Sequence, residues 1–156
     1  MEIYNEFRDM VKCLNNNTAQ YLVIGGYAVN HYGFSRFTGD FDIWVNKTPA
    51  NAEKVLKSIV DFGFGSLGIT KEDLMKDDAV IQLGYPPVRI DFLIDLHGVP
   101  FNECFQRRKD VEIENIIFPF IHVNDLIESK IIANRDKDQL DVKRLIKIVE
   151  RSKKSK

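Results

Sequence analysis

The pattern of hydrophobic and polar positions predicts a series of short helices and strands. Near the start of the chain, apolar residues recur every three or four positions, which is the spacing of one face of a helix. The residues on that face are Ile3, Phe7, Met10, Val11 and Leu14. The apolar run over residues 21–24 then ends in Gly25 and Gly26, which predicts a buried strand, a tight turn and a short helix from Ala28 to about Tyr32.

The rest of the chain alternates in the same way between the spacing of a helix and the spacing of a strand. A strand is predicted over residues 41–45, and a helix follows Thr48 and Pro49, which suit the N-cap and the first helical position. Further on, the pattern predicts a glycine-rich loop at 62–68, strands at 79–83 and 88–94, an amphipathic segment at 101–107, a β-rich stretch at 111–123, and helices at 125–134 and 137–151. The fold class is therefore α+β (mixed α/β), with a mixed central sheet flanked by helices and with C-terminal helices.

We expect a single domain over residues 1–156. The chain has the length of one domain, and the pattern shows no internal repeat or low-complexity linker. The catalytic elements would lie at about 21–95 and a C-terminal helical part at about 123–151. With 22 basic and 23 acidic residues the net charge is -1, so a polyanion must be bound by a local group of charges.

Cysteine usage and hydropathy predict a cytoplasmic protein. The two cysteines, Cys13 and Cys104, do not make a disulfide framework, and a start that includes Glu2 and Glu6 is unlike a signal peptide. The longest apolar run, over residues 116–121, is far too short to span a bilayer. We therefore expect a reducing environment and no membrane segment.

The sharpest chemical feature of the sequence is a pair of carboxylates, Asp40 and Asp42. Side chains two positions apart on a strand point to the same face, so both acids can reach one site while the apolar residues between and after them bury the other face. Spacing alone is weak, because 14 aspartates in 156 residues give about one Asp-x-Asp by chance. Asp91, on the strand predicted at 88–94, is the third candidate.

Three clustered carboxylates predict a metal centre. Two carboxylates about 4 Å apart repel each other by roughly 4 kcal/mol at an effective dielectric constant near 20, and a cation reverses the sign of that energy. Oxygen ligands favour Mg²⁺, with Mn²⁺ as an alternative, and two such ions would activate a hydroxyl and neutralise a leaving pyrophosphate. Asp95 shares a strand face with Asp91 and is the fallback third ligand.

Other residues are candidates for binding phosphate. Gly25 and Gly26 lie between a strand and a helix, where missing Cβ atoms would let a triphosphate approach backbone N–H groups, although a plain tight turn also explains them. Arg36 is either a phosphate ligand or a surface loop charge. Lys130 lies in the apolar stripe of its helix and needs an anion, which is either a triphosphate or Asp138 of the last helix.

The combination of these motifs resembles that of a known superfamily. Ile24-Gly25-Gly26, Asp40-Phe41-Asp42-Ile43 and Ile90-Asp91-Phe92 resemble the defining pattern of the DNA polymerase beta nucleotidyltransferase superfamily. The run over residues 25–42 is similar to a compact bacterial branch that includes the AbiE-type (AbiEii-like) abortive-infection toxins. The matching positions are Ala28, His31, Arg36 and Thr38. A second stretch, Lys130 followed by Arg135-Asp-Lys-Asp138 and Asp141, is similar to a signature of the same branch.

The resemblance implies a nucleotidyltransferase fold and a role for each candidate. Asp40, Asp42 and Asp91 would hold two metal ions, and the nucleoside triphosphate would be bound by Gly25, Gly26, Arg36, Thr38 and Lys130. The implied reaction is Mg²⁺-dependent transfer of an NMP from an NTP to a hydroxyl, with release of pyrophosphate. The acceptor stays open between tRNA, a protein and a small molecule, and the existence of a toxin or antitoxin partner stays open as well.

Two other functions stay open at the level of the sequence. A non-catalytic nucleotide- or partner-binding protein of a toxin–antitoxin-like system would keep the fold without the reaction, but the presence of all three acids argues against such a loss. A two-metal phosphodiesterase uses similar carboxylates. The glycine pair ahead of the acids favours transfer over hydrolysis.

Overall fold

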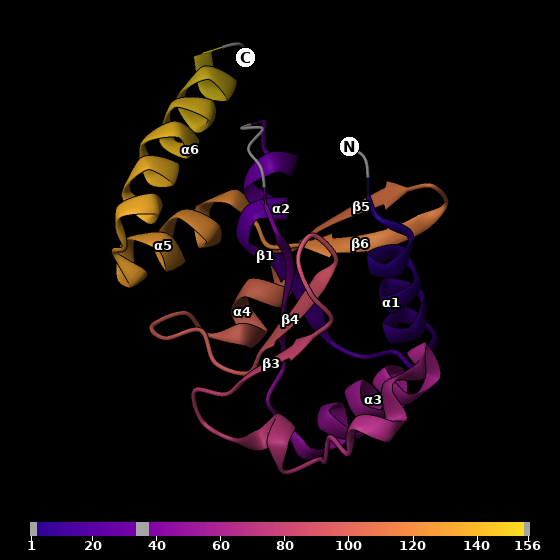
Figure 1. Cartoon of the computed structure of the whole chain (residues 1–156). Coiled ribbons are helices and arrows are strands. Elements are labelled where there is room, and N and C mark those ends of the chain that lie inside the picture. Colours follow the sequence, from indigo (N-terminus) through magenta and orange to yellow (C-terminus); the bar gives the residue numbers. More distant parts are fainter. Residues whose placement is uncertain (1–2, 34–37, 155–156) are drawn as a thin grey trace.

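In the described part of the chain, six strands form one mixed sheet with helices on both faces (Figure 1). The structure is a computed structural model that describes residues 3–33 and 38–154. Its strands are β1 (Tyr21–Ile24), β2 (Asp40–Val45), β3 (Val80–Leu83), β4 (Arg89–Leu93), β5 (Lys109–Ile113) and β6 (Ile116–Phe120). Its α-helices are α1 (Asn5–Asn16), α2 (Gly25–His31), α3 (Pro49–Ile59), α4 (Phe101–Gln106), α5 (Val123–Ala133) and α6 (Asp136–Lys154). The α+β class predicted from the sequence is confirmed.

The strand that carries Asp40 and Asp42 lies in the interior of the sheet. The strand order is β3-β4-β2-β1-β6-β5. β2 pairs in parallel with β4 and antiparallel with β1, and this register places Asp42 beside Asp91 of β4 and beside Ile24 of β1. The C-terminal end of β1, which leads into the two glycines, therefore lies beside the acids of β2.

Alternation along β2 separates the core from the acids. Phe41 points to the face that α1 covers, where its ring stacks on Phe7 with the centroids 4.8 Å apart. Trp44 points to the opposite face and meets Phe101 of α4 edge-on, with the centroids 5.0 Å apart. Aromatic pairs of this kind contribute about 0.5–1.5 kcal/mol beyond the burial of their area. Because side chains alternate, Asp40 and Asp42 share the face of Trp44.

The C-terminal helices α5 and α6 lie side by side, on the other side of the molecule from α1 and α3 (Figure 1). The side chain of His122 caps α5 by accepting a hydrogen bond from the backbone N–H of Asn124 at 3.1 Å. Asn134, in a left-handed conformation with φ 52°, ends α5 and turns the chain into α6. α6 has 19 residues, and none of the helices in the described residues is both long and apolar enough to cross a membrane.

Several predicted boundaries differ from the structure by one to three residues, and two segments differ in a way that has a physical reason. α2 begins at Gly25 rather than Ala28, because Gly25 adopts a φ of +69° that lets the chain turn from β1 directly into the helix. The predicted loop at 62–68 belongs to short helical turns, a π-helix at Val60–Phe64 and a 3₁₀-helix at Gly65–Leu67. Gly63, with a φ of +114°, bends the first of these turns.

Candidate active site

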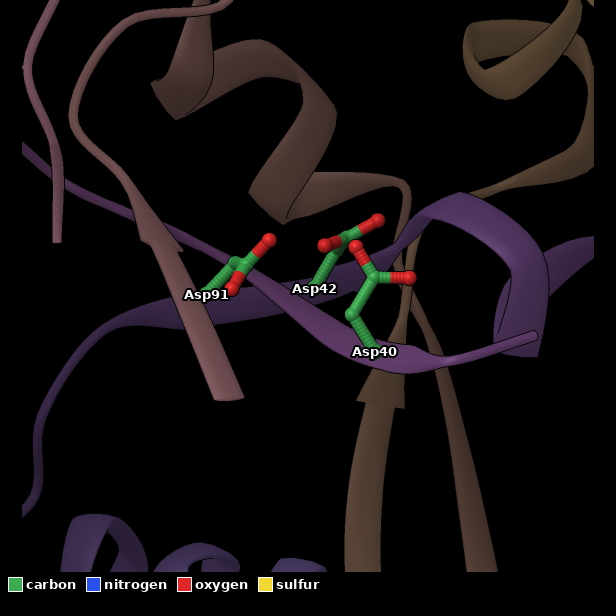
Figure 2. A group of neighbouring side chains, drawn as sticks. All are labelled: Asp40, Asp42 and Asp91. Carbon is green, nitrogen blue, oxygen red and sulfur yellow. The ribbon is translucent and has the colours of Figure 1, made fainter. Parts of the chain in front are cut away.

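Asp40, Asp42 and Asp91 point toward one another from two neighbouring strands (Figure 2). One carboxylate oxygen of each residue lies within 4.8 Å of those of the other two. Asp91 is only 5% exposed, and the other two are partly buried. The parallel register of β2 and β4 brings together acids that are far apart in the sequence, and the result is a compact cluster of oxygen ligands.

Arg89 is the counter-charge of this cluster. Its Nε donates a hydrogen bond to Oδ1 of Asp91 at 2.8 Å. One of its terminal nitrogens donates to Oδ2 of Asp91 and to Oδ2 of Asp40, at 3.0 Å in both cases. The register explains these contacts, because Arg89 lies opposite Asp40 on the neighbouring strand and two positions before Asp91.

The three carboxyl groups differ in their electrostatic surroundings. Burial, together with the charges of Asp40 and Asp91, raises the pKa of Asp42 to about 7. Burial also raises the pKa of Asp91, which the contact with Arg89 offsets only in part. Burial opposes ionisation of Asp40 as well, but hydrogen bonds with Asp91 and Arg89 hold its pKa below the ordinary value. A cation bound in the cluster would therefore favour release of the proton from Asp42.

Gly25 and Gly26 are required by the side chains that pack against them. A Cβ atom on Gly25 would overlap Oδ2 of Asp42, and a Cβ atom on Gly26 would lie 2.7 Å from the side chain of Thr38. The hydroxyl of Thr38 in turn donates to the backbone oxygen of Asp40 at 3.0 Å. The absence of two Cβ atoms thus lets the start of α2 lie directly against the acids.

A polar cavity of about 200 Å³ connects the glycines with two of the acids. On the side of the sheet it is lined by Gly25, Gly26, Thr38, Gly39, Asp40 and Asp42. Three cations, Lys130, Arg135 and Lys137, complete the lining from α5, from the turn after it and from the start of α6. The cavity therefore presents ligands for a metal ion and for phosphate oxygens in one space.

Lys130 contacts one of the two partners that the sequence left open, Asp138. Lys130 is buried, with 6% of its surface exposed. Its ammonium nitrogen lies 3.3 Å from Oδ1 of Asp138 and 3.0 Å from Oδ2 of Asp141. Asp138 is fully buried and also accepts a hydrogen bond from Nε of Arg135 at 2.6 Å. The predicted contact with Asp138 is present, and Lys130 also lines the cavity, so one partner does not exclude the other.

Comparison with known protein families agrees with the motifs. Residues 3–156 match the family described as "Nucleotidyl transferase of unknown function (DUF2204)". The chain belongs to this family. A search among curated proteins finds no significant match. The mixed sheet and the acidic cluster therefore belong to a nucleotidyl transferase family member, in agreement with the superfamily that the glycine and aspartate motifs resemble.

The ligand atoms that the acidic cluster offers fit a hard divalent cation. All of the side-chain donors are carboxylate oxygens, which Mg²⁺ and Mn²⁺ prefer over nitrogen or sulfur. The raised pKa of Asp42 shows that the buried carboxylates disfavour a third negative charge, and a cation would relieve that repulsion. Among the described residues, these three acids are the group whose geometry suits a metal.

Arg135 and Lys137 were not among the nucleotide-binding candidates drawn from the sequence. Both belong to the Arg-x-Lys-Asp stretch that resembles a signature of the compact bacterial branch, so a signal was present. They lie at the junction of α5 and α6, where the helical period is interrupted. For that reason, periodicity did not indicate which way their side chains point.

The other candidates lie in different surroundings. Arg36 is outside the residues that the structure describes. Asp95, the fallback ligand, is not a member of the cluster and accepts a hydrogen bond from the backbone N–H of Asp78 at 2.6 Å. His31 stacks on Phe120 with the ring centroids 4.4 Å apart, and burial lowers its pKa. These contacts give Asp95 and His31 structural roles.

Proposed function

We propose that the protein is an Mg²⁺-dependent nucleotidyltransferase that moves an NMP from an NTP to a hydroxyl acceptor and releases pyrophosphate. The observation that carries the proposal is the single cavity shared by Asp40, Asp42, the two glycines and three cations. An NTP needs this combination, because its phosphates must contact both a metal ion and positively charged groups.

The carboxylates are the proposed metal ligands. Asp40 and Asp42 line the cavity, and Asp91 completes the cluster from β4. A bound Mg²⁺, or Mn²⁺ in its place, supplies charge neutralisation for the leaving pyrophosphate and lowers the pKa of the attacking hydroxyl.

The basic residues of the cavity are the proposed phosphate ligands. Lys130, Arg135 and Lys137 line it together with the backbone of Gly25 and Gly26. Hydrogen bonds between such cations and phosphate oxygens are shorter and stronger than bonds between neutral groups. Thr38 keeps the acids in place through its bond to Asp40. Arg36 remains a proposed phosphate ligand through the family resemblance.

In the proposed reaction the acceptor oxygen forms a bond to the α-phosphorus as the bond from that phosphorus to the pyrophosphate oxygen breaks. The hydroxyl proton goes to the carboxylate of Asp91, which acts as the general base. Before a nucleotide binds, both Asp91 oxygens accept hydrogen bonds from Arg89, which fixes the carboxylate in orientation. Positioning of the reactants and neutralisation of charge account for most of the rate enhancement in transfers of this type.

The proposal includes the finer expectations from the sequence. The match of the 25–42 run and of the Lys130 and Arg135 motifs supports an AbiE-type branch, and with it a toxin or antitoxin partner. We propose tRNA, a protein or a small molecule as acceptor, and one domain working in a reducing cytoplasm. Both cysteines are free thiols, which supports that compartment.

Transfer of labelled nucleotide tests the proposed reaction. The protein is incubated with each α-³²P-labelled NTP and Mg²⁺, in turn with total RNA, cell protein and a small-molecule extract. The comparison variants are Asp42→Asn and, as a matched control, Asp110→Asn, which removes an exposed carboxylate from β5 at the far edge of the same sheet. Wild type and Asp110→Asn are expected to transfer label to one acceptor class, and Asp42→Asn to transfer none.

The outcomes separate the functions left open by the sequence. NTP binding without transfer to any acceptor would favour the non-catalytic binding protein. In a parallel incubation with ³²P-labelled RNA, release of labelled NMP would favour a phosphodiesterase. Equal transfer by Asp42→Asn would remove the acidic cluster from the mechanism.

A further inference from the structure

Arg89 divides the carboxylate cluster into two halves. Two of its nitrogens bond to Asp91, at 2.8 and 3.0 Å, and one of these also bonds to Asp40 at 3.0 Å. The hydrogen bonds of Arg89 to acids of the described residues go to these two and not to Asp42. Asp42 instead lines the cavity together with Asp40. One half of the cluster therefore faces the cavity, and a cation bridges the other half.

The bridged half is a position where a second metal ion would lie. In two-metal sites the ions are about 3.5–4 Å apart and share carboxylate ligands. The terminal nitrogen of Arg89 lies 3.0 Å from Oδ2 of Asp40 and 3.0 Å from Oδ2 of Asp91. An ion bound to the same oxygens would overlap the guanidinium group and would be repelled by its positive charge.

We propose that Arg89 is a positioning residue that limits the nucleotide-free protein to one divalent cation, held by Asp40 and Asp42. This inference rests on the metal-dependent transfer proposed above. The guanidinium group holds Asp40 and Asp91 in place, and a second ion binds only after Arg89 has left them.

Arrival of the nucleotide provides a reason for Arg89 to move. Guanidinium groups bind phosphate oxygens in the same two-point manner as carboxylates, so the triphosphate offers Arg89 a competing partner. The side chain of Arg89 is 28% exposed, so it is accessible to solvent and can leave the two acids. The second ion then enters after the NTP, and the full metal centre forms only when there is a substrate to use it.

The number of ions bound without nucleotide tests this order. Free Mn²⁺ is measured by electron paramagnetic resonance during titration of the wild type and of the variants Arg89→Gln and Arg89→Lys. We expect one bound Mn²⁺ in the wild type and two in Arg89→Gln, with the affinity for the second ion raised at least about 100-fold by removal of the charge. Arg89→Lys keeps a charge for folding, but its single ammonium cannot reproduce the two-nitrogen contact, so it is also expected to take a second ion, less tightly.

Arg108→Met is the matched control. Nε of Arg108 donates to Oδ1 of Asp110 at 3.1 Å, with the same two-residue spacing, beside the edge strand β5. This variant is expected to bind one ion, like the wild type. Urea unfolding in metal-free buffer verifies that each variant is folded, and Arg89→Lys keeps the test decisive if Arg89→Gln does not fold.

Failure of this inference is distinguishable from failure of the proposed function. Two ions in the nucleotide-free wild type, or one ion in a folded Arg89 variant, would overturn the role of Arg89 and leave the metal site in place. A wild type that binds no Mn²⁺ even in the presence of an NTP would overturn the metal site itself.

Discussion

Replacement of Asp42 by asparagine is expected to stabilise the metal-free protein at high pH and to remove its stabilisation by Mg²⁺. The carboxyl group of Asp42 is buried near two other acids, which raises its pKa from 3.8 to about 7. Asparagine keeps the shape of the side chain and removes its charge. The substitution therefore tests whether the site carries an electrostatic cost that a metal ion offsets.

The sign of the effect follows from proton linkage. Between about pH 4 and pH 7 the folded wild type binds more protons at Asp42 than the unfolded chain, so its free energy of unfolding falls as the pH rises. One pKa unit corresponds to about 1.4 kcal/mol, so the cost at pH 8 reaches up to about 4 kcal/mol. Asp42→Asn has no such titration, and its advantage over the wild type should grow with pH by up to this amount.

Mg²⁺ should narrow or reverse the difference. A ligand present at 100 times its Kd stabilises the folded state by about 2.7 kcal/mol. The wild type should gain this stabilisation, and the variant, which lacks a cavity-facing ligand, should gain much less. Comparison of EDTA with saturating Mg²⁺ thus separates the electrostatic cost from the metal contribution.

Urea unfolding monitored by tryptophan fluorescence is a suitable assay. Trp44 is the single tryptophan of the chain and is buried on β2, two residues from Asp42. Curves are recorded near pH 4.5 and pH 8, in EDTA and in Mg²⁺, with Asp110→Asn as control. A constant difference between wild type and Asp42→Asn at both pH values would refute a raised pKa at Asp42. Equal stabilisation of both proteins by Mg²⁺ would refute its role as a ligand.

Three further expectations concern the same cavity. Gly25→Ala should destabilise the fold by more than about 1 kcal/mol, measured by urea unfolding. The alanine would need a left-handed φ of +69°, and its Cβ atom would overlap Asp42. Gly68→Ala, with a φ of +71° and open space around the Cβ position, is the control for backbone strain alone. Lys130→Met should cost about 3–5 kcal/mol of unfolding free energy, because it leaves buried Asp138 and Asp141 short of a counter-charge; no loss would show that this ion pair is unimportant. The apparent affinity for Mg²⁺ should rise with pH up to about 7 and then level off, because Mg²⁺ displaces the proton of Asp42. Titration calorimetry in two buffers of different ionisation enthalpy should therefore show proton release at about pH 6 but not at about pH 8.5.

The elements that the sequence predicted well are those with an uninterrupted period. On α1, four of the five residues assigned to the apolar face, Phe7, Met10, Val11 and Leu14, are buried in the structure. On β2, a period of two placed Asp40 and Asp42 on one face, and the structure has the same alternation. In both cases a single local rule, the repeat of the element, decides which side chains point inward.

The arrangement of the site depends on contacts between strands, which a single sequence does not encode locally. Periodicity placed Asp91 on a strand over residues 88–94, but the contact of Arg89 with Asp40 arises from the parallel register of β4 with β2. The glycines are another case. A strand followed by Gly25 and Gly26 predicted a turn, whereas the structure shows why these positions lack side chains, since Asp42 and Thr38 occupy the space of the missing Cβ atoms.

The three basic residues that line the cavity differ in how far their charge is already balanced by ion pairs within the protein. Lys130 and Arg135 are engaged with Asp138, and Lys130 also with Asp141, so much of their charge is balanced within the protein. Lys137 is exposed, lines the cavity, and lowers the pKa of Asp42 through its charge. Because an ion pair already formed must be weakened before its cation can bind phosphate, an incoming triphosphate gains most from Lys137. Besides the proposed contacts with phosphate, Lys130 and Arg135 hold α5 and α6 together through Asp138 and Asp141, so the packing of the C-terminal helices decides where these cations lie in the cavity.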